Sequence, residues 1–166
     1  SAALAVELIN RGEGDFLMKG LLSTDRYMRA ILNKEKGLME NGAILSHVTV
    51  AEPANYHKLL IFGDVAIIPL PDLNQKVAIT NYLIKTAHFL GIENPKVGIQ
   101  AASEQTLPKI PSCAEGAIIA KMAQRGQIKG AIVEGPLGLD LIIDKESAEI
   151  KGIKSEVCGD ADCILF

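Results

Sequence analysis

Apolar and polar residues alternate along the chain in a pattern that predicts helices and strands in turn. Apolar residues recur at helical spacing over 2–9, and a glycine pair then separates this helix from a predicted strand at 16–18. Either Ser23 or Thr24 can cap the next helix, which we expect to end at Gly37. A helix that feeds a strand is the alternation typical of α/β proteins.

The next segments predict a hairpin followed by a long helix. The runs HVTVA (47–51) and HKLLIF (57–62) are rich in β-forming residues and are separated by a short loop that contains proline and asparagine. Asp72 and Gln75 then have the spacing of a capping box, which predicts a helix that ends near Gly91. Part of the sheet is therefore expected to be antiparallel.

The second half of the chain repeats the strand and helix pattern. Its expected elements are a strand at KVGIQAA, a helix opened by Ser112 with Glu115 at capping-box spacing, a strand at KGAIVEG, a helix over 145–151 and a final strand at CILF. We therefore predict an α/β fold with mostly parallel sheets, flanking helices and one hairpin. The proline-bounded stretch PLPD suggests a boundary at residue 71, which gives parts of two α/β domains, 1–71 and 72–166.

Composition narrows the class of protein. Apolar residues make up 48% of the chain and aromatic residues 4%, which fits an aliphatic α/β core. The net charge of −3, with no basic patch, argues against a nucleic-acid partner. No apolar stretch is long enough to span a membrane, and residues 1–9 lack the basic flank of a signal peptide, so we expect a cytoplasmic protein.

The loop at the end of the first predicted strand is the first candidate for chemistry. In an open α/β sheet, ligands bind beyond the carboxyl ends of the strands. There Ser23 and Thr24 precede a helix that carries Arg29, and the free N–H groups of a helix start attract phosphate or carboxylate. The alternative is that a hydroxyl only caps the helix and the arginine is solvated.

Two further loops carry acidic residues. Glu134 and Asp140 flank the sequence GPLGL, in which Gly135 and Pro136 predict a sharp turn. These acids can orient a substrate group, or they can simply accept hydrogen bonds from backbone amides. Asp64 follows a glycine between two apolar runs, and we expect it either in a turn or paired with a lysine or arginine.

Several familiar motifs are absent from the sequence. No HExxH or similar motif indicates a metal site, although His47 and His57 can face each other across the predicted hairpin. The chain contains no GxGxxG, GxxxxGK[ST] or GxSxG, so a Rossmann site, a P-loop and a nucleophile elbow are not supported. The three cysteines form no CxxC pair, and we expect them to be reduced.

Seven segments, taken in order, closely resemble the phosphate acetyl/butyryltransferases, or phosphotransacylases, and most of all the butyryltransferase branch. They are MKGLLSTDRYMRAILNKEKGL, SHVTV, LLIFGDVAIIPLPDLNQKV, AHFLGIENPKV, PKIPS, KMAQRGQIKGAIVEGPLGLD and KGIKSEVCGDADCILF. The resemblance implies a two-domain architecture like that of isocitrate and isopropylmalate dehydrogenases, with a cleft between the domains. It also implies a homodimer.

The resemblance also implies an activity and a set of site residues. The reaction is reversible transfer of a short acyl group (butyryl, branched-chain or acetyl) between CoA and inorganic phosphate, with CoA as a substrate and no bound cofactor or metal. Arg29 is expected to contact the phosphate, and the other residues carried over fall into two groups. Lys19, Ser23 and Thr24 are expected at the phosphate, and Gly20, Asp64, Glu134, Gly135, Pro136 and Asp140 are expected to line the cleft.

This sequence departs from the family pattern in ways that keep a rival reading open. The catalytic Ser-Arg pair and a nearby Asp are expected beyond Phe166, and a strand and a helix are expected before Ser1, so we expect these residues alone to be inactive. Ile68 stands where the family commonly has asparagine, and Glu134 where it usually has aspartate. The rival is a non-catalytic CoA-binding, anion-binding or assembly domain. A hydroxyacid dehydrogenase would need a metal-binding Asp cluster that is not visible.

Overall fold

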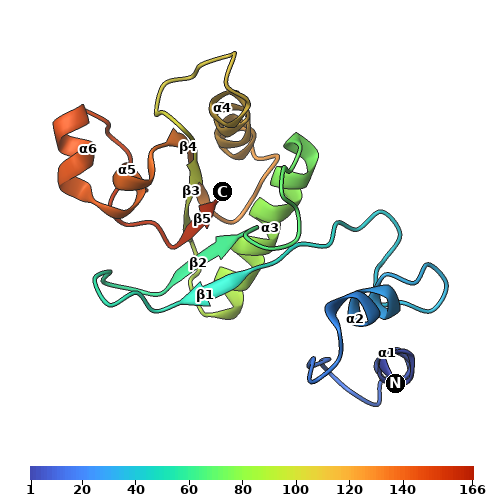
Figure 1. Ribbon diagram of the computed structural model, residues 1–166. Helices are drawn as coiled ribbons and strands as arrows, with labels where there is room; N and C mark the ends of the chain where they lie inside the picture. Colours follow the sequence, from blue (N-terminus) through green and yellow to red (C-terminus); the bar gives the residue numbers. More distant parts are fainter. The chain divides into compact units, whose positions relative to one another are not determined.

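Two groups of elements follow one another along the chain in the computed structural model, which describes residues 1–166 (Figure 1). They form two units, Ser1–Leu45 and Ser46–Phe166. The boundary thus lies between Leu45 and Ser46, whereas the sequence suggested a break at residue 71. The stretch PLPD is a loop inside the second unit, because strands on both sides of it pair in the same sheet.

The first unit is built on two helices, α1 (Ala2–Asn10) and α2 (Thr24–Ile31). The helix predicted over 2–9 is therefore confirmed, and the Ser1 hydroxyl caps it by accepting a hydrogen bond from the N–H of Leu4. The two helices pack against each other, and Val6 is the fully buried side chain of α1. Because α2 contributes only half-buried side chains, the core of this unit is small.

Two predictions for the first unit were wrong. Residues 16–18 form no strand, and the side chains of Phe16 and Met18 are 80% and 81% exposed. A strand needs a neighbour that pairs with its backbone, and the elements of this unit are both helices. In addition, α2 ends at Ile31, ahead of Gly37, which lies in a later turn closed by hydrogen bonds to Asn33 and Ile31.

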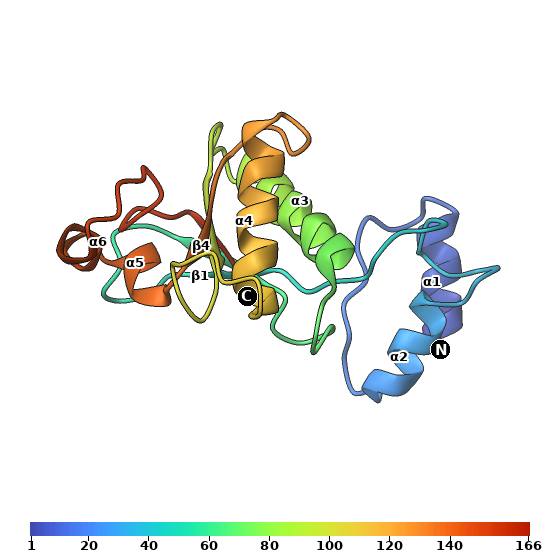
Figure 2. The same ribbon diagram turned by 90° about the horizontal axis from the view of Figure 1, so that it is seen from above.

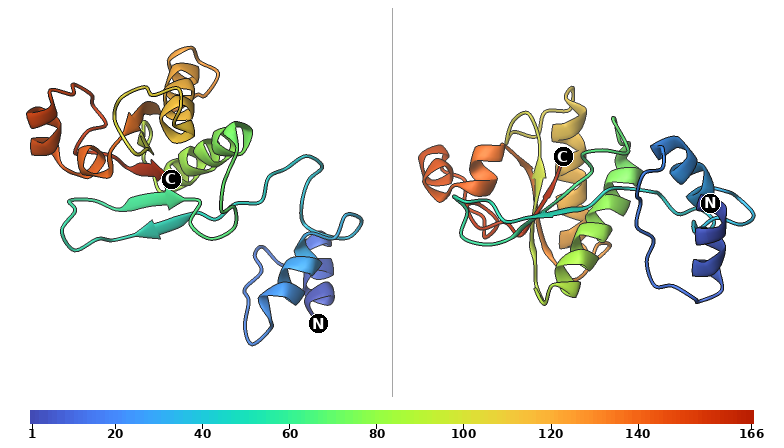
Figure 3. Two further views of the ribbon diagram at one scale, coloured as in Figure 1. Left: turned by 45° about the horizontal axis from the view of Figure 1, so that its top comes forward. Right: turned by 60° about the horizontal axis from the view of Figure 1, so that its bottom comes forward.

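The second unit contains a five-stranded sheet, which is mostly parallel with one hairpin, as the sequence predicted. Its strands are β1 (Thr49–Ala51), β2 (Leu60–Gly63), β3 (Lys96–Gln100), β4 (Ile132–Leu137) and β5 (Cys163–Leu165). They lie in the order β1-β2-β5-β3-β4, so the last strand of the chain is inserted at the centre of the sheet. Only β1 is antiparallel, and Figure 3 shows it beside β2 as the predicted hairpin.

Helices cover both faces of this sheet and make it the middle of three layers (Figure 2). The helices are α3 (Leu73–Phe89), α4 (Pro111–Gln124), α5 (Leu139–Ile143) and α6 (Lys145–Lys151). On the face of α3 and α4, Leu83 and Ile119 pack with the central strands, and on the face of α5 and α6, Ile142 does so. No helix of the chain combines the length and the apolar character needed to cross a bilayer.

The helix caps agree with the sequence at α3 and differ at α4. Asp72 accepts a hydrogen bond from the N–H of Gln75 at 2.9 Å, and the Gln75 side chain accepts one from the N–H of Asp72 at 2.8 Å, which confirms the capping box. Gly91, with φ of +85°, ends that helix as predicted. At α4, however, Ile110 is the N-cap and Pro111 begins the helix, so Ser112 opens no capping box.

The residue expected to complete the second capping box instead joins two helices. The Glu115 carboxylate, in α4, accepts a hydrogen bond from the Lys76 ammonium of α3 at 2.6 Å. The side chains are only 11% (Lys76) and 23% (Glu115) exposed. Because either charge would be costly without its partner, this pair fixes the first turns of α3 and α4 relative to each other.

A second ion cluster closes the amino edge of the sheet, where the parallel strands begin. Asp160 accepts hydrogen bonds from Lys96 and His57, and Lys58 lies 2.9 Å from both Asp160 and Asp162. Burial alone would raise the pKa of Asp160, but the hydrogen bonds from Lys58, Lys96 and His57 hold this pKa far below its usual value. The cluster therefore joins the starts of β2, β3 and β5.

Replacing Lys76 by methionine tests the helix pair. The change leaves the Glu115 charge partly buried without its partner, so we expect the free energy of unfolding in urea to fall by about 3 kcal/mol. The control is the double variant Lys76→Met, Glu115→Leu, which removes both charges and should recover most of that loss. If the double variant were as unstable as the single one, the pair would not act as a unit.

Candidate functional site

The carboxyl edge of the sheet is where four parallel strands end side by side. Asp64 follows β2, Ala101 follows β3, Gly138 follows β4 and Phe166 follows β5. Ligands of open α/β sheets bind at this edge, and it is opposite to the edge closed by the Asp160 cluster. Of the residues predicted to line a cleft, Asp64 and Asp140 lie at this edge.

Asp64 is held by four hydrogen bonds within the second unit. One carboxylate oxygen accepts from the Ser46 hydroxyl at 3.0 Å and from the N–H of His47 at 3.1 Å. The other accepts from the N–H groups of Ala66 and Ile67, both at 2.8 Å. The carboxylate therefore ties the segment before β1 to the turn after β2, and the expectation of a turn residue is confirmed.

The same contacts keep Asp64 ionised. Only 8% of the residue is exposed, and burial by itself would raise its pKa. The hydrogen bonds from Ala66, Ile67, Ser46 and His47 outweigh burial, so the pKa of Asp64 lies below its usual value of 3.8. Because both oxygens are already satisfied by donors of the protein, Asp64 is an organising residue rather than a free acid or base.

The turn that Asp64 organises frames a cavity of about 280 Å³ at the end of β2. Four of its five lining residues are apolar, namely Val65, Ala66, Ile68 and Pro69, and the fifth is Asp64. Val65 is 50% exposed, and Ile68 is half-buried against the core below. The carboxyl edge thus carries a hollow that is open to solvent and has both polar and apolar atoms in its lining.

The stretch Glu134–Pro136 lies within β4, so the sharp turn predicted there was wrong. Pro136 is accommodated because β4 is an edge strand of the sheet, where a missing N–H costs little. A Cβ on Gly135 would lie 2.6 Å from that of Ile99, so this position has no room for a side chain. Glu134 is half-buried and accepts a hydrogen bond from the N–H of Gly135, as expected for an acid that bonds backbone.

Asp140 lies in the first turn of α5 at the carboxyl edge and is half-exposed. Its carboxylate lies 3.0 Å from the ammonium of Lys151 in α6, which in turn lies 3.6 Å from the Glu104 carboxylate. The hydrogen bond from Lys151 lowers the pKa of Asp140, and the same contact raises the pKa of Lys151. Neither Lys151 nor Glu104 was singled out from the sequence, because the contact joins segments far apart along the chain.

The predicted anion residues of the first unit are exposed. Arg29 is 80% exposed and donates from Nε to both carboxylate oxygens of Asp25 at 2.9 Å, one turn earlier in α2. Ser23 is the N-cap of α2 but its hydroxyl makes no capping hydrogen bond. The Ser23 side chain therefore does not cap the helix. Arg29 is solvated, as the alternative interpretation of this loop expected.

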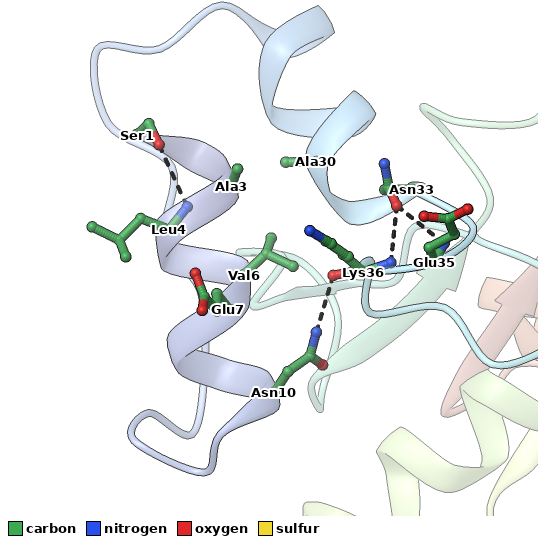
Figure 4. Close-up of a pocket in the computed structure, with 10 residues that line it drawn as sticks. All are labelled: Ser1, Ala3, Leu4, Val6, Glu7, Asn10, Ala30, Asn33, Glu35 and Lys36. Atoms are coloured by element: carbon green, nitrogen blue, oxygen red, sulfur yellow. Dashed lines mark hydrogen bonds between the residues drawn. The ribbon is translucent and has the colours of Figure 1, made fainter.

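The first unit has two hollows, and the predicted anion-binding residues do not line the same one. Lys19 and Gly20 line a cavity of about 280 Å³ together with apolar side chains that include Met18 and Leu22. A larger hollow of about 560 Å³ lies between α1 and the end of α2, where Asn10 donates to the carbonyl of Lys36 at 3.0 Å (Figure 4). Neither hollow is lined by Ser23, Thr24 or Arg29.

The histidines do not face each other across the hairpin. The register of β1 and β2 pairs Thr49 with Phe62, which places His47 opposite Asp64 rather than His57. His57 instead reaches Asp160 at 2.8 Å, at the amino edge. The loop of the hairpin is longer than the one expected from the sequence, which is why this pairing was missed.

Comparison with known proteins decides the family. The family model described as phosphate acetyl/butaryl transferase matches residues 1–166. The chain belongs to this family. It is 46% identical over 166 residues to the phosphate butyryltransferase of Clostridium acetobutylicum, covering 100% of this chain and 55% of that protein. It is 42% identical over 163 residues to the phosphate acetyltransferase of Thermotoga maritima, covering 98% of this chain and 55% of the relative.

Solved structures confirm that this family member has the fold of the phosphotransacylases. A branched-chain phosphotransacylase from Enterococcus faecalis matches with a TM-score of 0.85 and 30% identity, over 99% of this chain and 58% of that one. A phosphotransacetylase from Streptococcus pyogenes matches with a TM-score of 0.79 at 24% identity, over 99% of this chain and 50% of that one, which supports the fold alone. The chain thus spans about half the length of the relatives it matches.

Replacing Asp64 by asparagine tests its role as an organising charge. At pH 7 we expect the free energy of unfolding to fall by about 2 kcal/mol, because an amide NH₂ would face backbone N–H donors. The folded pKa is below 3.8, so the stabilisation is present above that value and is lost as the pH falls through the folded pKa. Urea unfolding at a series of pH values from about 7 down to about 3 measures this difference.

The matched control for Asp64 is Asp15→Asn, since Asp15 is an exposed aspartate. It should change stability by no more than about 0.5 kcal/mol. A difference between the wild-type protein and Asp64→Asn that stayed constant down to pH values below 3.8 would contradict the account.

Proposed function

We propose that the intact protein is a phosphate acyltransferase that moves a short acyl group between CoA and inorganic phosphate. A phosphate oxygen attacks the thioester carbonyl, the new C–O bond forms, and the C–S bond breaks to release the CoA thiolate, which takes up a proton. The reverse reaction regenerates acyl-CoA. The observation that carries this proposal is the family match over the whole of residues 1–166, together with 46% identity to a phosphate butyryltransferase.

The exposed residues of the first unit suit the phosphate. Lys19 and Arg29 offer positive charge, and Ser23 and Thr24 offer hydroxyl donors at the start of α2. The pair of Arg29 with Asp25 is exposed and therefore worth no more than about 1 kcal/mol. A phosphate that accepts two hydrogen bonds from the guanidinium can replace Asp25 at little cost, so the observed pairing is compatible with this role.

The residues at and below the carboxyl edge suit positioning rather than proton transfer. Asp64 fixes the turn after β2, and Asp140 is held by Lys151. The missing side chains of Gly135 and Gly116 allow β4 to pack closely on α4, because a Cβ on Gly116 would lie 3.1 Å from Pro136 and a Cβ on Gly135 would lie 3.3 Å from the Gly116 carbonyl oxygen. We therefore assign no catalytic proton transfer to these residues.

The remaining parts of the proposal concern the substrates, the catalytic residues and the state of the intact protein. We propose that CoA is a substrate and that no prosthetic group takes part in the chemical step. The catalytic Ser-Arg pair and aspartate implied by the resemblance are proposed to lie outside these 166 residues, with Gly20 close to the bound substrates. We further propose that the intact protein is a cytoplasmic homodimer.

One observation favours a second candidate, a binding or assembly domain without catalysis. The arginine expected at the phosphate is 80% exposed and already paired with Asp25. Such a domain would retain CoA or anion binding and would form no acyl phosphate.

Thiol release by the intact gene product separates the two candidates. We expect release of free CoA from acetyl-, butyryl- or isobutyryl-CoA only when phosphate is present, detected with a thiol reagent. Arg29→Gln should lower kcat/KM for phosphate by about 10- to 100-fold, since a charged hydrogen bond contributes about 1.5 to 3 kcal/mol.

Arg26→Gln is the matched control, because Arg26 is also exposed and lies one turn earlier in the same helix. It should change kcat/KM by less than about threefold. Absence of phosphate-dependent thiol release with every short acyl-CoA would reject the acyltransferase. Equal losses in both variants would reject the role of Arg29.

A further inference from the structure

We propose that Lys151 is a positioning residue for acyl transfer, because its ammonium connects the loop after β3 to the first turn of α5 at the carboxyl edge of the sheet. This inference rests on the proposed function and goes beyond it, since it assigns a role to a residue outside the proposed phosphate site. Lys151 lies in the last turn of α6, and both of its partners come from earlier segments of the second unit.

The carboxyl ends of β3 and β4 are the point where the connections of the sheet change sides. The chain leaves β3 for α4 on one face of the sheet and leaves β4 for α5 on the other face (Figure 1). The two strands are parallel neighbours. Open α/β sheets bind ligands beyond the carboxyl ends of their strands at such a switch point. The loop over 101–110 and the start of α5 therefore flank the part of the edge that is best placed for a substrate.

Lys151 bridges the two segments that diverge at this switch point. Its ammonium lies 3.0 Å from the Asp140 carboxylate in the first turn of α5. It also lies 3.6 Å from the Glu104 carboxylate in the loop after β3. One cation thus connects segments that follow two different strands and lead to opposite faces of the sheet.

The loop after β3 has few other polar links to the helices. Its first residue, Ala101, is buried and donates its N–H to the carbonyl of Leu137 at 2.8 Å. Over 102–107, the ion pair of Glu104 is joined by one hydrogen bond, from the Cys113 thiol to the carbonyl of Ser103 at 3.5 Å. A thiol is a weak donor, so the Lys151 bridge is the stronger link between this part of the loop and a helix.

The bridge lies near the surface, so its loss should affect the loop more than the fold. The exposed fractions of the side chains are 38% for Lys151, 49% for Asp140 and 25% for Glu104. An ion pair with this exposure is weak, and removing it shifts an equilibrium by only a few fold. We therefore expect a measurable change in substrate binding without a change in overall stability.

Lys151→Met, made in the intact gene product, removes the bridge and keeps the aliphatic stem. The assay is thiol release with saturating phosphate and the short acyl-CoA that the wild-type protein uses best. We expect kcat/KM for this acyl-CoA to fall about three- to fivefold, through KM rather than kcat, because the loop is less often in place while the reacting groups are unchanged. Lys151→Arg keeps the charge and should return kcat/KM to within about twofold of the wild-type value.

Lys154→Met is the matched control, because Lys154 is an exposed lysine three residues later that forms no ion pair. It should leave kcat/KM within about 1.5-fold of the wild-type value. The urea midpoint should be the same for the wild-type protein and for the Lys151 and Lys154 variants. An equal loss in Lys151→Met and Lys154→Met, or a loss in kcat alone, would overturn the role of Lys151.

Glu104→Gln tests the bridge from the side of the loop and covers the case in which Lys151→Met fails to fold. We expect a loss about equal to that of Lys151→Met, and no further loss in the double variant, because both changes break the same bridge. Losses that multiply in the double variant, or unchanged kcat/KM in Glu104→Gln, would overturn the positioning role and leave the proposed function intact. A wild-type protein inactive with every short acyl-CoA would overturn both.

Discussion

The buried carboxylate of Asp64 is the interaction on which the candidate site depends. Its two oxygens bind the start of the second unit, at Ser46 and His47, and the turn after β2, at Ala66 and Ile67. A buried charge is stable only when its hydrogen bonds are satisfied, so both segments must keep these positions for the fold to form. The hollow after β2 is a direct consequence, because the turn carries the residues that line it.

Charge in the second unit is used mainly to hold elements together. Lys76 and Glu115 join two helices, the Asp160 cluster joins three strands, and Lys151 joins Asp140 to the loop after β3. The first unit differs, since its proposed phosphate-binding groups are exposed and Arg29 is held only by a surface ion pair. The two units therefore differ in how they use charge, since ion pairs of the second unit link its elements whereas those of the first lie at the surface.

The sequence predicted those elements whose signals are local. The capping box at Asp72, the stop at Gly91 and the mostly parallel sheet with one hairpin were predicted from spacing and turn residues, and the structure contains all of them. The predicted strand at 16–18 failed because a strand depends on a partner that no local pattern reveals. The predicted turn at Gly135 failed because the strand lies at an edge of the sheet and tolerates proline there. Similarly, the links from Glu115 to Lys76 and from Asp140 to Lys151 depend on tertiary contacts.

A crystal structure of the intact protein with bound butyryl phosphate tests the central claim most directly. The account predicts that Asp64 keeps its hydrogen bonds to Ser46, His47 and the turn after β2 when the ligand is bound. An Asp64 oxygen that left these donors and accepted a hydrogen bond from the ligand would contradict it.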